Sequence, residues 1–480
     1  MLDKILIANR GEIACRILRT CRRLGIRTVA VHSEADAGAP HVRAADEAVL
    51  LGPAPVRESY LDIERVIAAA RQTGARAVHP GYGLLSENAS FGRALAAAGI
   101  TFIGPPPEVL DAFGDKIKAR SVARAAGTSP TPGTDGPIDP ADAAALAAEG
   151  ERIGYPLLVK AAGGGGGIGM QLVQKADGLA RAAQTCSDRG KSAFADARVY
   201  LERYIESPKH IEVQIFGDGR GGYVALGERE CSLQRRHQKI VEETPSAAPF
   251  FAGPAGTARR RALWEAALRV VASVGYVGAG TVEFVASPAG ELYFLEVNAR
   301  LQVEHCVTEM VTGLDLVEQQ IRVASGEGLG PAVWARAGAR LGVDGSSGDE
   351  QNGAPAGHAI EVRVYAEDPA KRFAPQPGRI ARLVWPEPAP WLRIETGVEQ
   401  GSEVTPYYDP LLAKLVAHGP TREDARARLD AALGATELEL VGAVGPAATN
   451  LAFLRKLLAS ERFVDGSYDT LVAEALAKAK

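Results

Sequence analysis

Two apolar stretches, Gly278-Ala-Gly-Thr-Val-Glu283-Phe-Val285 and Glu291-Leu-Tyr-Phe-Leu-Glu296-Val-Asn298-Ala-Arg300, predict a β-hairpin that carries polar side chains. Both stretches show the period-two alternation of a strand, and Ser287-Pro-Ala-Gly290 supplies the turn between them. If the hairpin is symmetric about this turn, Glu283 and Glu296 lie nearly opposite each other, with their Cβ atoms about 5 Å apart. Two carboxylates so close predict a bound cation, whereas the alternative is an exposed polar strand face.

The same face of the second strand continues with Asn298 and Arg300. Carboxylate and amide oxygens are the ligands that Mg²⁺ prefers, and a guanidinium is a clamp for anions. The hairpin therefore predicts a metal-bound phosphoryl-transfer site.

The residues that follow resemble a known family. The segment Glu296-Val-Asn-Ala-Arg300-Leu-Gln302-Val-Glu304-His305 is similar to the metal and bicarbonate motif of biotin carboxylases, which belong to the ATP-grasp superfamily. The resemblance covers nearly the whole chain, because further motifs follow in family order. These are Ile5-Leu-Ile-Ala-Asn9-Arg10-Gly11-Glu12, His79-Pro-Gly-Tyr82-Gly-Leu-Leu-Ser-Glu87, Leu233-Gln234-Arg-Arg-His237-Gln-Lys239 and Gly357-His358-Ala-Ile-Glu361-Val-Arg363.

Composition limits the classes of protein to consider. A chain of 480 residues with 46% hydrophobic content can form several packed domains. A net charge of −4 argues against nucleic acids or anionic membranes as the main partners. The five cysteines are scattered without a CxxC pair, which favours a reducing compartment over a disulfide framework or zinc knuckle. With no leader or membrane-length apolar run, the expected location is the cytoplasm.

The pattern predicts an α/β fold, and the resemblance implies a three-domain ATP-grasp architecture. Residues 4–8 and Thr28–His32 read as strands around a helix whose face carries Ile13, Ile17 and Leu24, and this βαβ opening predicts a parallel sheet. Its turn lacks the GxGxxG pattern, which argues against a dinucleotide-dependent dehydrogenase. The expected boundaries are an N-terminal parallel α/β domain at 1–114, an ATP-grasp domain at 115–328 with a lid lobe at about 131–204, a flexible linker at 329–356, a mixed α+β C-terminal domain at 357–466 and a helical tail at 467–480.

A glycine run lies after the strand that ends in Lys160. Gly163 to Gly169 contains almost no side chains, so its amides can surround phosphate oxygens while the run moves as a lid. A flexible linker is the alternative. The resemblance assigns Lys116 and Lys160 to the nucleotide phosphates and Gly166 and Gly167 to positions over them. Ile168 and Gln171 stand where family members commonly carry arginines, which puts lid closure and biotin dependence in question.

The strand-like segment Val199–Ile205 predicts the adenine side of the nucleotide site. By resemblance, Glu202, Arg203, Tyr204 and Ile205 hold the adenine and ribose, although a structural salt bridge is the alternative for Glu202. His210, Gln234 and His237 are likewise assigned to the nucleotide. The alternative for each histidine is an ordinary core residue.

Bicarbonate is a poor nucleophile, so its attack on ATP requires a base, a cationic site and neutralised phosphates. By resemblance, Glu304 is the base, and Arg363 stabilises the biotin enolate because its charge is permanent. Tyr82 is expected to line the biotin pocket, with a packed aromatic as the alternative. By resemblance, the bicarbonate site is expected to consist of Lys239, Arg300, Gln302 and the amide of Val303. Glu283, Glu296 and Asn298 are expected to hold one or two Mg²⁺ or Mn²⁺ ions.

The resemblance implies ATP-dependent carboxylation of biotin through carboxyphosphate, giving ADP and phosphate. No Met-Lys-Met biotinylation signature occurs, so the biotin carboxyl carrier protein and the carboxyltransferase are expected on separate chains, and family members usually form homodimers. Acetyl-CoA, and hence fatty acid biosynthesis, is the commonest final use; another acyl-CoA, pyruvate or urea-type acceptor is the alternative. Two rival functions are a different ATP-grasp carboxylate-amine ligase and a non-catalytic nucleotide-binding regulator.

Overall fold

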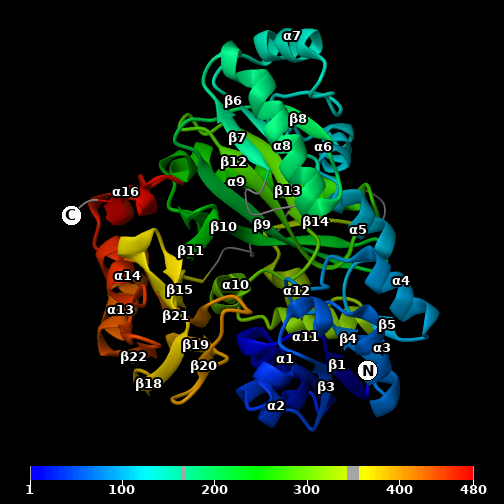
Figure 1. Cartoon of the computed structure of the whole chain (residues 1–480), viewed down its shortest axis with the longest axis vertical. Coiled ribbons are helices and arrows are strands. Elements are labelled where there is room, and N and C mark those ends of the chain that lie inside the picture. Colours follow the sequence, from blue (N-terminus) through cyan, green and yellow to red (C-terminus); the bar gives the residue numbers. More distant parts are fainter. Residues whose placement is uncertain (1, 164–168, 343–355, 479–480) are drawn as a thin grey trace.

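The computed structural model describes residues 2–163, 169–342 and 356–478 and is shown in Figure 1. The N-terminal part contains the expected parallel sheet in the order β3-β2-β1-β4-β5, with buried apolar strand residues such as Ile5 and Val29. Ile13 and Ile17 are buried on α1, whereas Leu24 lies one residue beyond the end of that helix. The elements are β1 (Lys4–Ile7), α1 (Gly11–Arg23), β2 (Arg27–Ser33), α2 (Pro40–Ala44), β3 (Glu47–Gly52), α3 (Ile63–Thr73), β4 (Ala77–His79), α4 (Ala89–Ala97), β5 (Thr101–Phe102) and α5 (Pro107–Gly114).

A separate small sheet, in the order β7-β6-β8, lies at the top of the molecule in Figure 1 with helices α7 and α8 beside it. Its core contains Leu157, Val159 and Leu201, which are buried against α8. This sheet places Lys160 and Glu202 on neighbouring strands. The elements are α6 (Lys116–Ala125), α7 (Ala143–Ile153), β6 (Leu157–Ala161), β7 (Met170–Val173), α8 (Leu179–Phe194) and β8 (Val199–Arg203).

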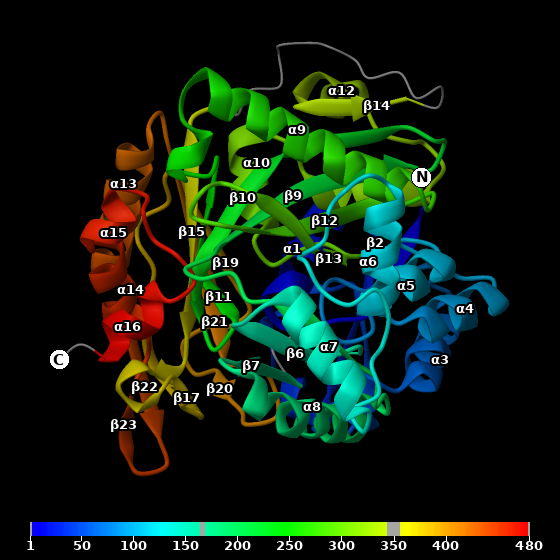
Figure 2. The ribbon, with the colours of Figure 1, turned by 90° about the horizontal axis from the view of Figure 1, so that it is seen from above.

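A long antiparallel sheet occupies the centre of the molecule, in the order β13-β12-β9-β10-β11-β15-β21-β19, with β14 paired to β10. Helix α9 packs on β9 and β10 (Figure 2). Helix α10 packs on β15, and α11 packs on β12. The elements are β9 (Lys209–Asp218), β10 (Tyr223–Arg235), β11 (Gln238–Thr244), α9 (Gly253–Ala272), β12 (Val277–Ala286), β13 (Leu292–Asn298), α10 (His305–Thr312), α11 (Leu316–Ala324), α12 (Pro331–Arg336), β14 (Ala339–Leu341), β15 (His358–Tyr365), β19 (Leu392–Thr396) and β21 (Leu411–Gly419).

The C-terminal strands continue the central sheet. β15 pairs with β11, so β15, β21 and β19 extend the central sheet rather than forming a sheet apart. A smaller sheet in the order β20-β18-β22-β23 lies beyond them. The remaining elements are β16 (Glu367–Asp368), β17 (Ala374–Pro375), β18 (Gly378–Val384), β20 (Glu403–Val404), α13 (Arg422–Ala435), β22 (Glu437–Gly442), β23 (Gly445–Ala447), α14 (Leu451–Leu458), α15 (Glu461–Val464) and α16 (Val472–Lys478).

The stretch expected to be a flexible linker, 329–356, contains regular structure. It includes α12, and β14 pairs with β10 in a register that sets Ala339 opposite Ala225. The short strand was missed because its pairing partner lies more than 100 residues earlier in the chain. The rest of the predicted linker, 343–355, is outside the described residues. Within the part of the chain that the structure covers, no helix has both the length and the apolar character required to cross a membrane.

Candidate active site

Neighbouring strands of the central sheet carry acidic side chains in one row. Glu283 of β12 lies opposite Glu296 of β13 and, on its other side, opposite Glu212 of β9. Glu212 in turn lies opposite Arg229 of β10. Directly opposite residues project from the same face of a sheet. The predicted facing of Glu283 and Glu296 is therefore confirmed, and the row is longer than the hairpin alone indicated.

Lys239, from β11, lies among three of the acidic groups. Its Nζ is 2.5 Å from Glu212, 2.8 Å from Glu283 and 2.7 Å from Glu304. Burial opposes the charge on Lys239, but these carboxylates raise its pKa well above the usual value. Burial likewise opposes the charge on Glu283, while Lys239 and His210 hold its pKa well below the usual range. The facing carboxylates predicted a bound cation, and Lys239 supplies part of that positive charge from within the chain.

Glu304 is the N-cap residue of α10, at the end of the turn that precedes this helix, and its side chain is fully buried. Its second carboxylate oxygen is 3.0 Å from Arg363 of β15, and Arg363 is also 2.6 Å from Glu242 of β11. Burial disfavours the charge, but Lys239 and Arg363 together hold the pKa of Glu304 well below its usual value. Glu304 is therefore ionised at neutral pH, with both oxygens engaged by cations.

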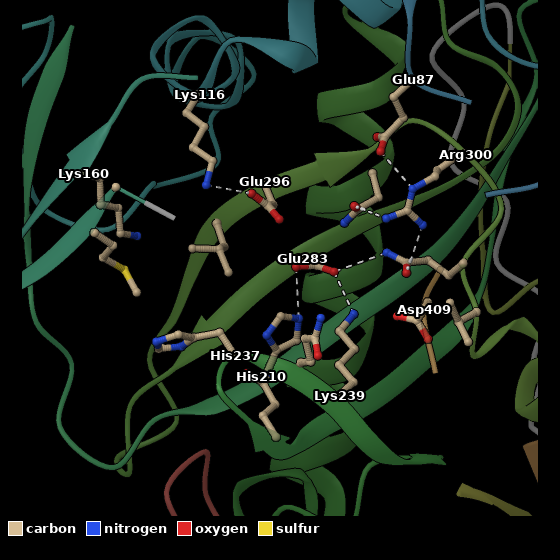
Figure 3. Close-up of a pocket in the computed structure, with 18 of the residues that line it drawn as sticks. Glu87, Lys116, Lys160, His210, His237, Lys239, Glu283, Glu296, Arg300 and Asp409 are labelled. Carbon is tan, nitrogen blue, oxygen red and sulfur yellow. Dashed lines mark hydrogen bonds and ion pairs between the residues drawn. The ribbon is translucent and has the colours of Figure 1, made fainter. Parts of the chain in front are cut away.

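Arg300 connects the end of β13 to the N-terminal part of the chain. Its Nε donates to Glu87 at 2.8 Å, and its terminal nitrogens donate to the side-chain oxygens of Asn298 at 3.0 Å and Gln302 at 3.3 Å. Gln302 also donates to Glu283 at 3.2 Å. These bonds hold Arg300 at the cavity wall (Figure 3). Its side chain stays partly exposed.

The two lysines expected to bind the nucleotide phosphates form salt bridges with carboxylates of the protein. Lys160 lies 2.5 Å from Glu202, which also accepts from Arg120 at 2.6 Å. The Glu202 carboxylate is thus held in a salt bridge, the structural alternative considered for it, and its contact with adenine stays a prediction. Lys116 lies 3.4 Å from Glu296 (Figure 3). Both lysines have to exchange carboxylates for phosphates if a nucleotide binds.

Two adjacent cavities, of about 430 and 410 Å³, collect most of the predicted residues. Arg236 and His237 lie in the left-handed region, as both central residues of a tight hairpin turn require, and this turn places His237 at both cavities. The first cavity is lined by Lys116, Lys160, His210, Gln234, His237, Lys239, Glu283, Glu296, Asn298, Arg300, Gln302, Val303 and Arg363. The second is lined by Lys160, Glu202, Arg203, Tyr204, Ile205, His210, Gln234 and His237.

Some predicted residues are placed differently. Glu304 does not line the first cavity but lies beneath it, in contact with Lys239 and Arg363. The hydroxyl of Tyr82 donates to Glu12 and Tyr82 is not a lining residue of either cavity. Gln171 is half-buried on β7, opposite Val159. Gly166, Gly167 and Ile168 lie outside the described residues.

Sequence reasoning missed several side chains that the site brings together. Glu212 binds Lys239, Glu242 binds Arg363, and Arg120 binds Glu202. For Glu212 a local signal existed, because His210, Glu212 and Gln214 alternate with apolar residues on one strand face. Ligand atoms of His210, Glu212 and Glu283 all lie within 4.8 Å of one another, so this cluster offers oxygen and nitrogen donors to a cation.

Family models match three consecutive parts of the chain. Residues 1–110 match the biotin carboxylase N-terminal domain, residues 115–331 match the carbamoyl-phosphate synthase L chain ATP-binding domain, and residues 361–475 match the biotin carboxylase C-terminal domain.

Relatives extend over the full chain. Biotin carboxylase 2 of Bacillus subtilis is 46% identical over 470 residues, covering 98% of both chains. The human mitochondrial propionyl-CoA carboxylase alpha chain is 44% identical over 98% of this chain, which spans 60% of that relative's length. The biotin carboxylase domain dimer of Hydrogenobacter thermophilus 2-oxoglutarate carboxylase, solved with MgADP, ADP and bicarbonate, matches with a TM-score of 0.89 and 39% identity over 100% of this chain and 99% of that one. Together with the buried site on the central sheet, these matches show that the chain belongs to the biotin carboxylases, ATP-dependent ligases.

Proposed function

We propose that this chain carboxylates biotin with bicarbonate and ATP, through carboxyphosphate. The observation that carries the proposal is the position of Glu304, a buried carboxylate between Lys239 and Arg363 beneath the first cavity. A base placed between two cations suits a substrate that is both an anion and a proton donor. The relative from Hydrogenobacter thermophilus, solved with MgADP and bicarbonate, supports the same assignment of substrates.

In the first step Glu304 accepts the bicarbonate proton while a bicarbonate oxygen attacks the γ-phosphorus of ATP. The bond from the γ-phosphorus to the β,γ-bridging oxygen breaks, giving carboxyphosphate and ADP. Lys239 and Arg363 depress the pKa of Glu304 in the structure, so the base strengthens when bicarbonate takes over part of their charge. The groups proposed to hold bicarbonate are Lys239, Arg300, Gln302 and the backbone amide of Val303.

The donor set around the first cavity fits a hard divalent cation. Glu283 and Glu296 face each other, and Asn298 adds an amide oxygen to the same wall. These three residues would hold one or two Mg²⁺ or Mn²⁺ ions, which neutralise phosphate charge when bound. The proposed nucleotide residues are Lys116, Lys160, Gly166, Gly167, Glu202, Arg203, Tyr204, Ile205, His210, Gln234 and His237.

In the second step the carbon–oxygen bond of carboxyphosphate breaks, releasing CO₂ and phosphate. Phosphate takes the N1′ proton of biotin, and the resulting enolate attacks CO₂ to give carboxybiotin. Arg363 is proposed to stabilise the enolate oxygen, because its guanidinium already lies beside Glu304 at the cavity wall. Tyr82 stays a proposed residue of the biotin pocket.

Several finer assignments are proposals. The biotin would be carried by a biotin carboxyl carrier protein and its carboxyl group passed on by a carboxyltransferase, with the present chain as a homodimer in the cytoplasm. A dimer is described for the Hydrogenobacter thermophilus domain. Acetyl-CoA is the proposed final acceptor, and the names of relatives extend the choice to propionyl-CoA and methylcrotonoyl-CoA. Carboxylation assays with each acyl-CoA and the partner proteins would decide among them.

The proposal is tested by ADP release from the purified chain with Mg-ATP, with bicarbonate and free biotin varied after avidin treatment. Release that requires both substrates supports the proposal. Release that ignores both would support a different ATP-grasp carboxylate-amine ligase, and nucleotide binding without turnover would support a regulator.

A further inference from the structure

A buried lysine outside the described cavities connects three parts of the chain behind the active site. Lys414 lies on β21 and is fully buried. Its Nζ donates to the backbone oxygen of Val303 at 2.6 Å and lies 3.1 Å from the carboxylate of Glu12 on α1. Lys414 therefore joins the C-terminal strands, the turn before α10 and the N-terminal helix.

The contact between Lys414 and Val303 lies next to two groups that are proposed to act on bicarbonate. The oxygen of Val303 belongs to the peptide unit that connects Val303 to Glu304, and a peptide unit is planar, so fixing its oxygen fixes the orientation of the whole unit. The amide N–H of Val303, a proposed bicarbonate ligand, belongs to the peptide unit just before the fixed one, and Glu304, the proposed base, comes just after it. The ammonium group of Lys414 thus fixes the backbone between the Val303 amide and the Glu304 side chain.

The sheet places this lysine beside the other cation of the site. Lys414 lies directly opposite Arg363 on β15, so both side chains project from the same face towards the turn at Glu304. Arg363 contacts the Glu304 carboxylate at 3.0 Å, whereas Lys414 contacts its preceding carbonyl. The strand pair β15–β21 therefore holds the side chain and the backbone of the same turn.

The charge of Lys414 is maintained despite burial. Burial lowers the pKa of its ammonium group, but the neighbouring Cys306, Glu12 and Glu361 raise it above the usual value. A buried ion pair often adds no stability over well-packed apolar side chains of the same volume. Stability alone is therefore a poor account of this lysine, and a role in positioning the turn explains the contact to Val303.

We propose that Lys414 is a positioning residue for the bicarbonate step, which holds the Val303–Glu304 peptide so that the amide and the base face the same substrate. This inference rests on the proposed carboxylation of biotin. It assigns no contact with substrate to Lys414. It predicts that the loss of the ammonium group weakens the use of bicarbonate while the nucleotide cavity, lined by other strands, is unchanged.

The test compares Lys414→Met with the wild-type protein in ADP-release assays, varying bicarbonate and ATP separately. Misplacement of a reacting group by about 1 Å costs about 100-fold in rate. We expect the KM for bicarbonate to rise at least about 10-fold, or kcat/KM for bicarbonate to fall equally, with the KM for ATP within about 2-fold of wild type. Lys371→Met, which changes a lysine with a 75% exposed side chain, is the matched control.

Further variants separate positioning from simple support of the fold. Glu12→Gln keeps the donor to Val303, so the KM for bicarbonate should stay near that of wild type. Combining Glu12→Gln with Lys414→Met removes both charges of the pair, so thermal stability should recover relative to Lys414→Met while the KM for bicarbonate stays raised. Lys414→Arg retains a donor and should restore part of the bicarbonate affinity.

The outcomes are distinguishable. An unchanged KM for bicarbonate in Lys414→Met, or a KM that recovers together with stability in the double variant, would overturn the positioning role. If Lys414→Met does not fold, the double variant supplies the same comparison. Wild-type ADP release that ignores bicarbonate would instead refute the proposed function.

Discussion

The bicarbonate end and the nucleotide end of the site are built differently. At the bicarbonate end, Lys239 and Arg363 lie on strands of the central sheet and each contacts more than one buried carboxylate. At the nucleotide end, Lys160 lies on the separate small sheet and pairs with Glu202. The proposed base and its cations are thus held by one continuous sheet, whereas Lys160 lies on a small sheet that shares no strand with it. Rigid placement suits proton transfer, and a lid suits the entry of a nucleotide.

The largest expected effect is at the base. Glu304→Gln should reduce bicarbonate-dependent ADP release at least about 100-fold, because an amide cannot accept the proton. Nucleotide binding should persist, since Glu304 is not a lining residue of the nucleotide cavity. Steady-state ADP release and nucleotide titration measure the two properties, and Glu403→Gln, an exposed carboxylate on β20, is the control. Unchanged turnover would remove Glu304 from its proposed role.

The second-largest effect is expected at Lys239, the cation that three carboxylates share. Lys239→Met leaves Glu212, Glu283 and Glu304 without the ammonium group between them, and loss of one partner from a buried ionic cluster costs about 3 to 5 kcal/mol. We expect a lower urea midpoint together with loss of activity. A variant as stable as wild type would indicate that the carboxylates find protons or another cation, and would weaken the view that the bicarbonate end is rigid.

Glu243 lies on β11, the strand that carries Lys239, but it does not line either cavity. It therefore tests whether a buried, charge-paired carboxylate outside the cavities contributes to activity. Glu243 contacts His358 at 2.6 Å and Arg422 at 2.6 Å. Burial opposes its charge, but these partners lower its pKa from 4.5 to about 2. Because its folded pKa is depressed, its stabilising contribution is present above the unfolded pKa of about 4.3 and is lost as the pH falls towards 2.

Glu243→Gln should therefore lower the free energy of unfolding at pH 7 by about 3 kcal/mol, with no change in the KM for bicarbonate or ATP. The stability difference from wild type should shrink as the pH falls below about 4. Urea unfolding at pH 7, 4 and 3 checks this expectation. A difference that grows on acidification would contradict the sign of the pKa shift.

The smallest expected effect is at the nucleotide end. Lys160→Met removes one charged contact to a phosphate, which corresponds to about a 10-fold to 100-fold weaker ATP affinity. Stability should change little, because Arg120 still holds Glu202 at 2.6 Å. ATP titration followed by thermal unfolding measures both, with the exposed Lys175→Met in the same lobe as control. A large loss of stability would mean that the two ends of the site are equally rigid.

Local pattern predicted the parts of the site that lie close together in the sequence. The hairpin around Glu283 and Glu296, the strand that carries Lys160 and the opening β-α-β unit follow from short-range alternation and turn residues. The motifs quoted for the resemblance extended this to the family. The linker expected to be flexible at 329–356 contains α12 and β14, and β14 was missed because a strand of three residues carries little periodicity.

The sequence by itself determined the hairpin, the acidic and cationic residue types and the membership of the biotin carboxylases, because periodicity and motif order are properties of the chain. Only the tertiary structure decided which charges meet. Lys239 reaches Glu304 across 65 residues, β11 joins β15 across more than 100, and Lys414 reaches Val303 across 111. Such pairings depend on strand register between distant segments and on burial, which removes water and makes each unpaired charge costly. A local pattern of residues determines neither the register between distant strands nor the burial of a charged side chain.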